Sequence, residues 1–212
     1  MSLHRVMAIG GAMAILLFGG AYARRDFHGF SLVYRAANRQ GPIRRVADLD
    51  TVPVVDRIIE IPGHGSTMRA RVYLPTGRPH QTVLLVSGVH PTGIDEPRLI
   101  DLARKLAEAR VTVVTPDIPE LSRFELTPAV TDHIETAAAW LASSELAPSG
   151  RIGLMGISFS GGLAVVAAGR PALREVGNRI RQTTLWCRVC VCPKRLHGWQ
   201  SSERLLERRC YY

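Results

Sequence analysis

Short apolar runs along the chain separate longer stretches in which apolar and polar residues recur with a helical period. Residues 82–86, 111–114 and 152–155 are rich in branched apolar side chains, a composition typical of buried strands. Within these runs the apolar residues do not alternate strictly with polar ones. This pattern predicts strands of a sheet that is covered on both faces.

Two amphipathic helices are predicted between these strands. Asp95 and Pro97 open the first helix, and apolar residues then recur at helical spacing as far as position 107. Thr127, as N-cap, and Pro128, in the first turn, begin the second helix, which runs to about Leu141. Strands that alternate with helices of this length predict an α/β fold with a mostly parallel sheet.

Two further segments extend the predicted sheet on its N-terminal side. Residues 54–61 and 68–74 are predicted to form an antiparallel pair, and residues 62–66, which include two glycines, are predicted to form its turn. The sheet would then have about five strands, flanked by helices.

The N-terminus predicts a membrane-associated protein. The 18 residues 6–23 carry no charge, and as a helix rising ~1.5 Å per residue they would span about 27 Å of a ~30 Å hydrocarbon core. Residues 1–25 are therefore predicted to be a hydrophobic helix that acts as a signal anchor, or a signal peptide that is cleaved near Ala23 for export. Arg24 and Arg25 favour the uncleaved anchor. Residues 26–50 are basic and lack a clear period, which predicts a juxtamembrane linker.

The stretch 156–162, Gly-Ile-Ser-Phe-Ser-Gly-Gly, carries the chemistry that the sequence suggests. It lies between a predicted strand and a small-residue, helix-like run, which is the context of a nucleophile elbow. A sharp strand-to-helix turn exposes its serine and crowds the residues two before and two after it, here Gly156 and Ser160. Ser158 is the predicted nucleophile because the apolar run ends just before Gly156, and Ser160 is a second candidate.

An elbow of this kind also predicts an oxyanion site. The helix that starts here directs its free N–H groups and the positive end of its dipole toward charge that develops on an attacked carbonyl oxygen. The backbone N–H of Phe159 is therefore a predicted oxyanion donor.

Three segments in order resemble the strand ends of the α/β hydrolases, a family that includes esterases, lipases, dienelactone hydrolases and some peptidases. They are residues 84–90 (LLVSGVH), 113–117 (VVTPD) and 152–162 (IGLMGISFSGG). The resemblance covers residues 51–177 and corresponds to the N-terminal half of the fold. It implies a serine hydrolase that acts on a small-molecule ester or similar acyl bond, with no cofactor and no metal.

The resemblance also implies a second oxyanion donor in the loop after residue 86. In the family a loop of His-Gly type supplies that N–H group. Here the loop reads Ser-Gly-Val-His, so the N–H of Gly88 and that of Val89 are alternatives. His90 in the same loop is assigned to the lining of the substrate pocket.

The residues after the elbow do not supply the partners that the nucleophile needs. In the family the acid and the catalytic histidine follow later strands, whereas here no aspartate follows Asp132 and the sole histidine after Ser158 is His197. The predicted strand 152–155 would also lack a neighbour and form an exposed apolar edge, which predicts poor stability.

The tail 178–212 differs in composition from the rest of the chain. It holds all four cysteines and seven arginines and one lysine against two glutamates, so it carries +6 of the net charge of +9. The favoured interpretation is a disordered or frameshifted segment unrelated to the domain before it. One alternative is a zinc site formed by Cys187, Cys190, Cys192 and His197. Another is contact of the basic tail with nucleic acid or anionic lipid. Neither is favoured, and no nucleic-acid partner is expected.

The sequence therefore supports two functional hypotheses. The first is a membrane-associated serine hydrolase, truncated and inactive as this chain because its base and acid cannot be identified. The second is a non-catalytic, membrane-anchored interaction protein that retains a hydrolase-like scaffold. The substrate and the oligomeric state do not follow from the sequence.

Overall fold

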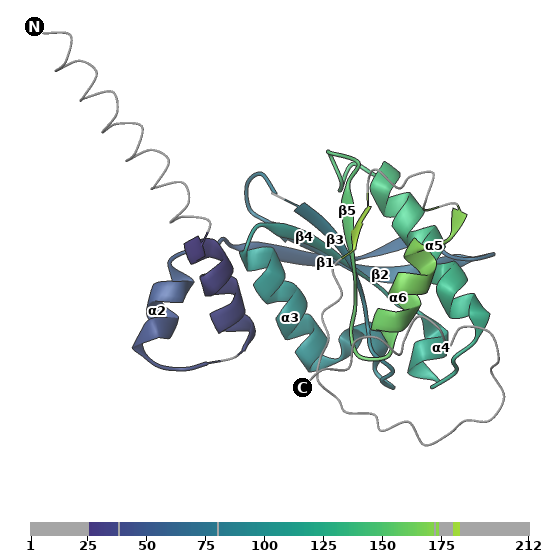
Figure 1. Cartoon of the computed structure of the whole chain (residues 1–212), viewed down its shortest axis with the longest axis horizontal. Coiled ribbons are helices and arrows are strands. Elements are labelled where there is room, and N and C mark those ends of the chain that lie inside the picture. Colours follow the sequence, from purple (N-terminus) through teal and green to yellow (C-terminus); the bar gives the residue numbers. More distant parts are fainter. Residues whose placement is uncertain (1–25, 38, 80, 172, 174–179, 183–212) are drawn as a thin grey trace, which may run out of the picture.

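The structure is a computed structural model that describes residues 26–37, 39–79, 81–171, 173 and 180–182 (Figure 1). A six-stranded sheet in the order β1-β2-β4-β3-β5-β6 runs through the centre of the described region. The pairs β3–β4, β3–β5 and β5–β6 are parallel, and β1–β2 and β2–β4 are antiparallel. The predicted α/β fold with a mostly parallel sheet is confirmed.

Strands β1 to β5 coincide with the strands that the sequence predicts. The strand bounds are β1 Val54–Pro62, β2 Thr67–Pro75, β3 Gln81–Val86, β4 Val111–Pro116, β5 Ile152–Gly156 and β6 Ile180–Gln182. The first two form the predicted antiparallel pair, in which Val54 lies opposite Pro75 and Pro62 lies opposite Thr67. In the sheet, β4 lies between β2 and β3. This order arises because the chain crosses over through a helix between the parallel strands β3 and β4, and no local sequence pattern predicts it.

Helices cover both faces of the sheet (Figure 1). Helix α3, Pro97–Glu108, lies on one face, and its apolar side packs against β2, β3, β4 and β5 through a cluster that includes Tyr73, Leu85 and Val113. The helix begins at Pro97 as predicted, but its N-cap is Glu96 and not Asp95: the Glu96 carboxylate accepts a 2.6 Å hydrogen bond from the Leu99 N–H.

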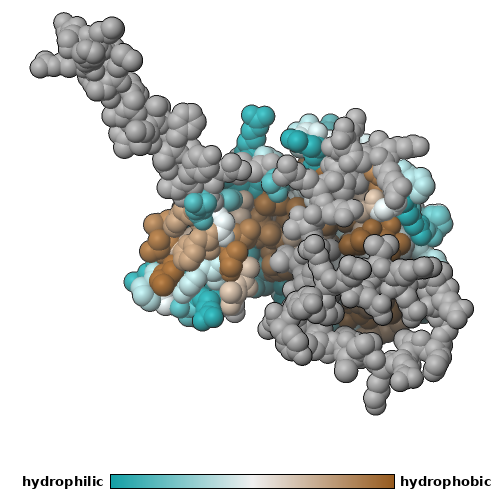
Figure 2. Space-filling model, in the orientation of Figure 1, coloured by the Kyte–Doolittle hydropathy of each residue, from teal (hydrophilic) through white to brown (hydrophobic). Residues whose placement is uncertain are grey.

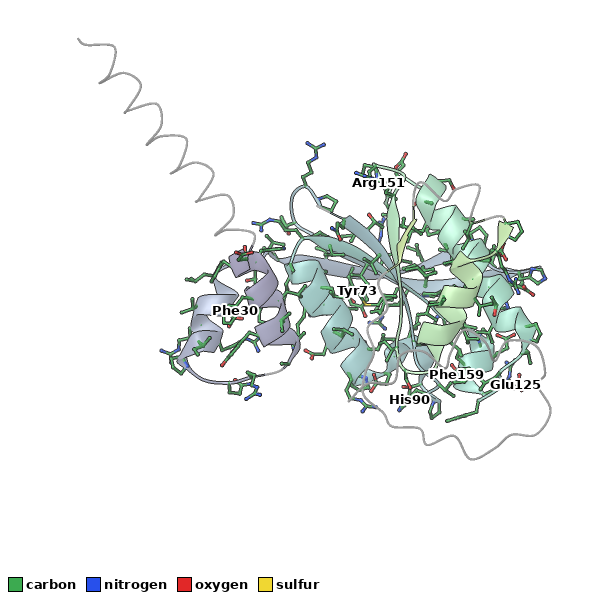
Figure 3. All side chains as sticks on the ribbon, in the orientation of Figure 1. Phe30, Tyr73, His90, Glu125, Arg151 and Phe159 are labelled. Atoms are coloured by element: carbon green, nitrogen blue, oxygen red, sulfur yellow. The ribbon has the colours of Figure 1, made fainter. Side chains whose placement is uncertain are left out.

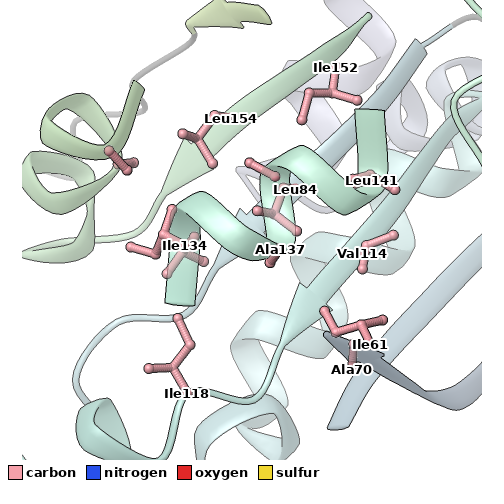
Figure 4. Close-up of a cluster of buried hydrophobic side chains, with 14 of the residues drawn as sticks. Ile61, Ala70, Leu84, Val114, Ile118, Ile134, Ala137, Leu141, Ile152 and Leu154 are labelled. Carbon is pink, nitrogen blue, oxygen red and sulfur yellow. The ribbon is translucent and has the colours of Figure 1, made fainter. Parts of the chain in front are cut away.

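The larger cluster lies on the opposite face. Helices α5, Pro128–Ser143, and α6, Ser160–Ala168, pack there against β3 and β5. Figure 4 shows Leu84 and Leu154 of the sheet meeting Ile134 and Leu141 of α5. Each of these four side chains is at most 2% exposed, and burial of such a side chain contributes about 1.5–3 kcal/mol. The short helices η1, Gly93–Asp95, and α4, Pro119–Ser122, follow β3 and β4.

Residues 26–50 carry helices where the sequence predicted a linker without periodicity. Residues 26–36 are helical, and α2 spans Pro42–Asp48. Arg35 is fully buried, and its Nη1 donates a 2.7 Å hydrogen bond to the Glu108 carboxylate of α3. The helical period of residues 26–36 is not visible in the sequence because one of its buried positions is this charged residue. The partner that allows its burial lies 73 residues further along the chain.

The predicted exposed edge of β5 is corrected by the structure. Strand β6 pairs in parallel with β5, with Ile152 opposite Ile180 and Leu154 opposite Gln182. A segment that the sequence analysis assigned to an unrelated tail therefore continues the sheet. Helix propensity and composition give no signal for a strand of three residues.

Several predictions concern parts of the chain outside the described residues. They are the hydrophobic helix within residues 1–25 and, apart from 180–182, the tail with its cysteines and His197. In the part of the chain that the structure does describe, no helix has the length and apolar content needed to cross a membrane.

Candidate active site

The elbow lies where β5 ends and α6 begins. The carboxyl ends of β3, β4 and β5 meet at one edge of the sheet, because these three strands are parallel. Ser158 stands at that edge with φ of 56°, in the left-handed region that is uncommon for residues other than glycine. The serine is exposed. An exposed serine in a left-handed conformation at a strand end has the geometry that the sequence predicts for a nucleophile.

Gly156 is required by the tightness of this turn. A Cβ atom at Gly156 would lie 2.2 Å from the backbone oxygen of Ser160 and 2.6 Å from the Gly161 nitrogen. Both contacts are far inside van der Waals distance, and both involve backbone atoms that cannot rotate away. The predicted crowding between the residues two before and two after Ser158 is therefore present.

Ser160, the second candidate nucleophile, has a structural role. Its side chain is fully buried, and its Oγ donates a 2.5 Å hydrogen bond to the Ser87 carbonyl at the end of β3. A hydroxyl that is buried and already bonded cannot meet a substrate from solvent. This bond instead fixes the first turn of α6 against the loop after β3, a contact that no local sequence pattern reveals.

The loop after β3 approaches Ser158 closely. A Cβ atom at Gly88 would lie 3.8 Å from the Ser158 Cβ and 3.5 Å from the Ile157 carbonyl oxygen. The Ile157 N–H donates a 3.1 Å hydrogen bond to the Val86 carbonyl, which holds the two segments together. Gly88 is therefore adjacent to Ser158, as an oxyanion donor must be.

The three candidate oxyanion N–H groups are those of Phe159, Gly88 and Val89. Within the described part of the chain, none of these three donates to a protein acceptor. The Val89 side chain packs against the larger apolar cluster, whereas the Phe159 ring is 52% exposed. Unengaged N–H groups beside an exposed serine can stabilise a developing negative charge.

His90 lies in the same loop and at the same edge of the molecule as Phe159 (Figure 3). Its Nδ1 and the Thr92 hydroxyl are 2.8 Å apart, and its carbonyl accepts a hydrogen bond from the Gly93 N–H. These bonds hold the side chain within its own loop. The position is compatible with the predicted place in the substrate-pocket lining.

A charged network anchors this loop to β2, and sequence reasoning did not identify it. The Arg71 guanidinium contacts the Asp95 carboxylate at 2.5 Å, and Arg69 lies 3.5 Å from Asp95 and 3.9 Å from Asp117. Burial raises the pKa of Asp117 above its ordinary value, against the opposing effect of Arg69. Asp117 also accepts a hydrogen bond from the Ile94 N–H. The network fixes the far end of the loop that carries Gly88.

The described histidines other than His90 are bonded to groups outside the elbow. The His64 N–H donates to His133 Nδ1 at 3.1 Å, and His133 Nε2 lies 3.7 Å from the Glu120 carboxylate. His28 pairs with Asp50 beside the N-terminal helices. No hydrogen bond joins Ser158 to His64, His90 or His133.

Comparison with solved structures identifies the fold. A brefeldin A esterase, a bacterial homologue of human hormone-sensitive lipase, is 20% identical, with a TM-score of 0.52 over 76% of this chain and 45% of the esterase. A dienelactone hydrolase from Anabaena variabilis is 18% identical, with a TM-score of 0.50 over 62% of each chain. An esterase from Pyrobaculum calidifontis is 27% identical over 74% of this chain and 48% of its own, with a TM-score of 0.46.

No protein-family model and no curated protein matches the sequence. The likeness to the brefeldin A esterase and the dienelactone hydrolase shows that the chain has the α/β-hydrolase fold, as its sequence predicted. The chain spans about half the length of these solved structures, between 45% and 62%.

Proposed function

We propose that this α/β-hydrolase-fold chain carries the nucleophile and oxyanion half of a serine hydrolase that acts on an ester or similar acyl bond. The observation that carries the proposal is the left-handed φ of 56° at an exposed Ser158, in a turn whose Gly156 admits no Cβ atom. Strain of this kind persists where the surrounding structure enforces it, and it is concentrated at functional sites.

The chemistry would use groups on two sides of the serine. Ser158 Oγ attacks the carbonyl carbon of the substrate while its proton passes to a base, and the carbonyl oxygen becomes an oxyanion. The N–H of Phe159 and that of Gly88 or Val89 would bind this oxyanion, since all three lack a protein acceptor in the described region. Collapse of the tetrahedral intermediate breaks the ester C–O bond, and the leaving alcohol takes the proton back from the base while the acyl group stays on Ser158. Water then hydrolyses this acyl-enzyme to a carboxylic acid and free Ser158.

Among the residues that the structure describes, none is bonded to Ser158 as a base would be. His64 and His133 bond elsewhere, and His90 Nδ1 is engaged by Thr92. We therefore propose that this chain by itself turns over ester substrates slowly or not at all. A serine without its base keeps only the contribution of the oxyanion site and of binding, which amounts to about 10³–10⁴-fold over water in serine proteases that have lost a triad member.

The proposal includes association with a membrane through residues 6–23, as an anchor, with export after cleavage near Ala23 as the alternative. Its support is the 18-residue uncharged stretch of the sequence. Small-molecule esters are the proposed substrates, because the structures that share the fold include a brefeldin A esterase and a dienelactone hydrolase.

Covalent labelling with a fluorophosphonate probe tests the nucleophile. Ser158 Oγ would displace fluoride from phosphorus and form a stable Ser–O–P bond. We expect slow labelling of the folded wild type and none of Ser158→Ala. Ser143→Ala, which alters an exposed hydroxyl on α5, should label at the wild-type rate. A folded wild type that never labels would show that the elbow is a remnant in a non-catalytic protein.

A further inference from the structure

The two N-terminal helices present a cluster of large apolar side chains to solvent. Of the twelve large apolar side chains that are exposed in the described region, five belong to this helical hairpin, residues 26–49. They are Phe30, Val33, Ile43, Val46 and Leu49, between 48% and 81% exposed. Figure 2 shows hydrophobic side chains gathered over these helices. A cluster of this kind marks an interaction surface, whereas scattered single residues do not.

The exposed residues occupy the outer side of each helix. On the helix at 26–36, Phe30 and Val33 are three positions apart, and the Phe30 ring meets that of Tyr34 with centroids 5.7 Å apart. On α2, Ile43 and Val46 have the same spacing. Residues three or four apart share a helix face, so each helix has one apolar outer stripe.

The inner side of the hairpin is fixed to the hydrolase fold. Ser31 Oγ donates a 2.6 Å hydrogen bond to the Ala47 carbonyl, which joins the two helices. Arg35, fully buried, binds Glu108 of α3 at 2.7 Å. The outer stripes therefore cannot turn inward without breaking the ion pair of the buried Arg35, and their exposure is a property of the folded domain.

Arginines border this apolar surface where the two helices connect. Arg39 and Arg45 are exposed, and Arg44 pairs with Asp48 at 2.8 Å. A hollow of about 460 Å³ in the connection is lined by Gln40, Gly41 and Pro42 together with Arg44 and Arg45. Apolar side chains flanked by arginines match the boundary between acyl chains and anionic headgroups.

We propose that this helical-hairpin surface lies in the interface of an anionic lipid bilayer. The occupant is a bilayer because the uncharged stretch 6–23 ends two residues before the hairpin begins. Two residues reach at most ~7 Å, so an anchor in the membrane brings the hairpin to the headgroup layer. The inference rests on the membrane association in the proposed function and is independent of Ser158.

The surface would act as a second contact that orients the domain on the membrane. The apolar stripes would enter the headgroup–acyl boundary to a depth of ~5–10 Å, and Arg39 and Arg45 would meet lipid phosphates. A domain held at two points cannot rotate freely about its anchor. The sheet edge that carries Ser158 would then keep a constant orientation relative to the bilayer.

Tryptophan reporters in the full-length chain test this placement. Val33→Trp and Leu49→Trp would be reconstituted with vesicles of phosphatidylcholine and phosphatidylglycerol, brominated at shallow acyl positions. We expect a blue-shifted reporter emission and about twofold or greater quenching by the bromolipid. Difference spectra against the parent chain remove the contribution of the three native tryptophans.

Val55→Trp and Val166→Trp are matched controls, because both valines are exposed but lie on β1 and α6. Their emission should be unaffected by bromolipid. Arg39→Glu with Arg45→Glu should reduce the quenching at position 49, and Arg151→Glu, which alters an exposed arginine before β5, should not.

Three results would overturn the inference. Equal quenching of all four reporters would place the whole domain nonspecifically on the lipid. Absence of quenching at positions 33 and 49, in chains that resist alkaline extraction from vesicles, would leave the anchor intact and refute the hairpin contact. Reporters that are blue-shifted without lipid, in proportion to protein concentration, would assign the surface to a second copy of the chain.

Discussion

At the scale of single residues, the elbow combines crowding with strain. Ser158 adopts φ of 56°, and the turn brings Gly156 so close to the backbone of Ser160 that no Cβ atom fits at position 156. The left-handed conformation costs about 1–2 kcal/mol for a residue with a Cβ atom. The fold sustains this cost because Ser160 binds Ser87 and Ile157 binds Val86, so both ends of the turn are fixed.

Gly156→Ala should destabilise the domain severely. The new Cβ atom would lie 2.2 Å from the Ser160 carbonyl oxygen, so the turn must open, and we expect a loss of about 3 kcal/mol or more in the free energy of unfolding. Denaturant unfolding measures this loss. Gly162→Ala is the control, because a Cβ atom there meets nothing within 4 Å, and an added methyl group in a helix should stabilise by about 0.5–1 kcal/mol.

Ser158→Gly should stabilise the fold relative to Ser158→Ala. Both variants remove the hydroxyl, but glycine adopts φ of 56° without the Cβ penalty that alanine keeps. We expect a difference of about 1 kcal/mol in the free energy of unfolding, measured by denaturant titration of the two variants side by side. Equal stabilities would mean that the turn is relaxed in solution and that Ser158 is not held in a strained conformation.

At the scale of elements, α5 and α6 are joined across the same face of the sheet by Arg170. The residue follows the end of α6, and its guanidinium contacts Asp132 and, at 3.0 Å, Glu135 of α5. The side chains of these three residues are between 19% and 30% exposed. The hydrogen bond from Arg170 holds the pKa of Asp132 below its ordinary value.

Arg170→Gln should weaken this connection by about 1 kcal/mol, because the pairs are partly exposed and screened by salt. The lowered pKa of Asp132 sets the pH dependence: the contribution is complete above the ordinary value of 3.8 and is lost as the pH falls through the lowered pKa. Urea unfolding of both proteins across the acid range measures it. The two stabilities should converge at low pH, whereas Arg151→Gln should match wild type throughout.

At the scale of the whole molecule, the N-terminal helices and the hydrolase fold form one described unit that depends on a buried charge. Arg35 has no exposed surface, its Nη1 meets Glu108, and its Nη2 is buried without a hydrogen-bond partner. A buried guanidinium tolerates this environment while its carboxylate partner is present. The same pair fixes the outward orientation of the hairpin surface.

Glu108→Ala should release the hairpin without unfolding the sheet. The unpaired Arg35 could regain water if the helices detach, so we expect detachment to become easier by about 2 kcal/mol, or roughly thirtyfold in population. Trypsin cleavage after Arg35, which is fully buried while the hairpin is attached, would measure it as a rate increase of similar size. Glu145→Ala, which alters an exposed carboxylate, is the control. Unchanged cleavage would show that the pair does not hold the hairpin.

Much of the central domain follows from the sequence by itself. Strands β1 to β5, the helices α3 and α5 and the position of the elbow depend on local features: apolar runs, helical period, proline in the first turn and small residues around a serine. These features act over a few residues, so they can be identified without knowledge of the chain path. The family resemblance added the expectation that the loop at Gly88 meets the elbow, which the structure places beside Ser158.

Other features were decided by tertiary structure alone. The sequence favours Ser158 and leaves Ser160 as a second candidate, whereas the structure buries Ser160 and bonds it to Ser87, 73 residues earlier. Arg35 seemed part of a basic linker, but Glu108 makes its burial possible. The place of β4 beside β2, and of β6 beside β5, likewise depends on pairing between distant segments. Local pattern reports what a segment can form, whereas burial and pairing depend on which distant residues the folded chain brings to it.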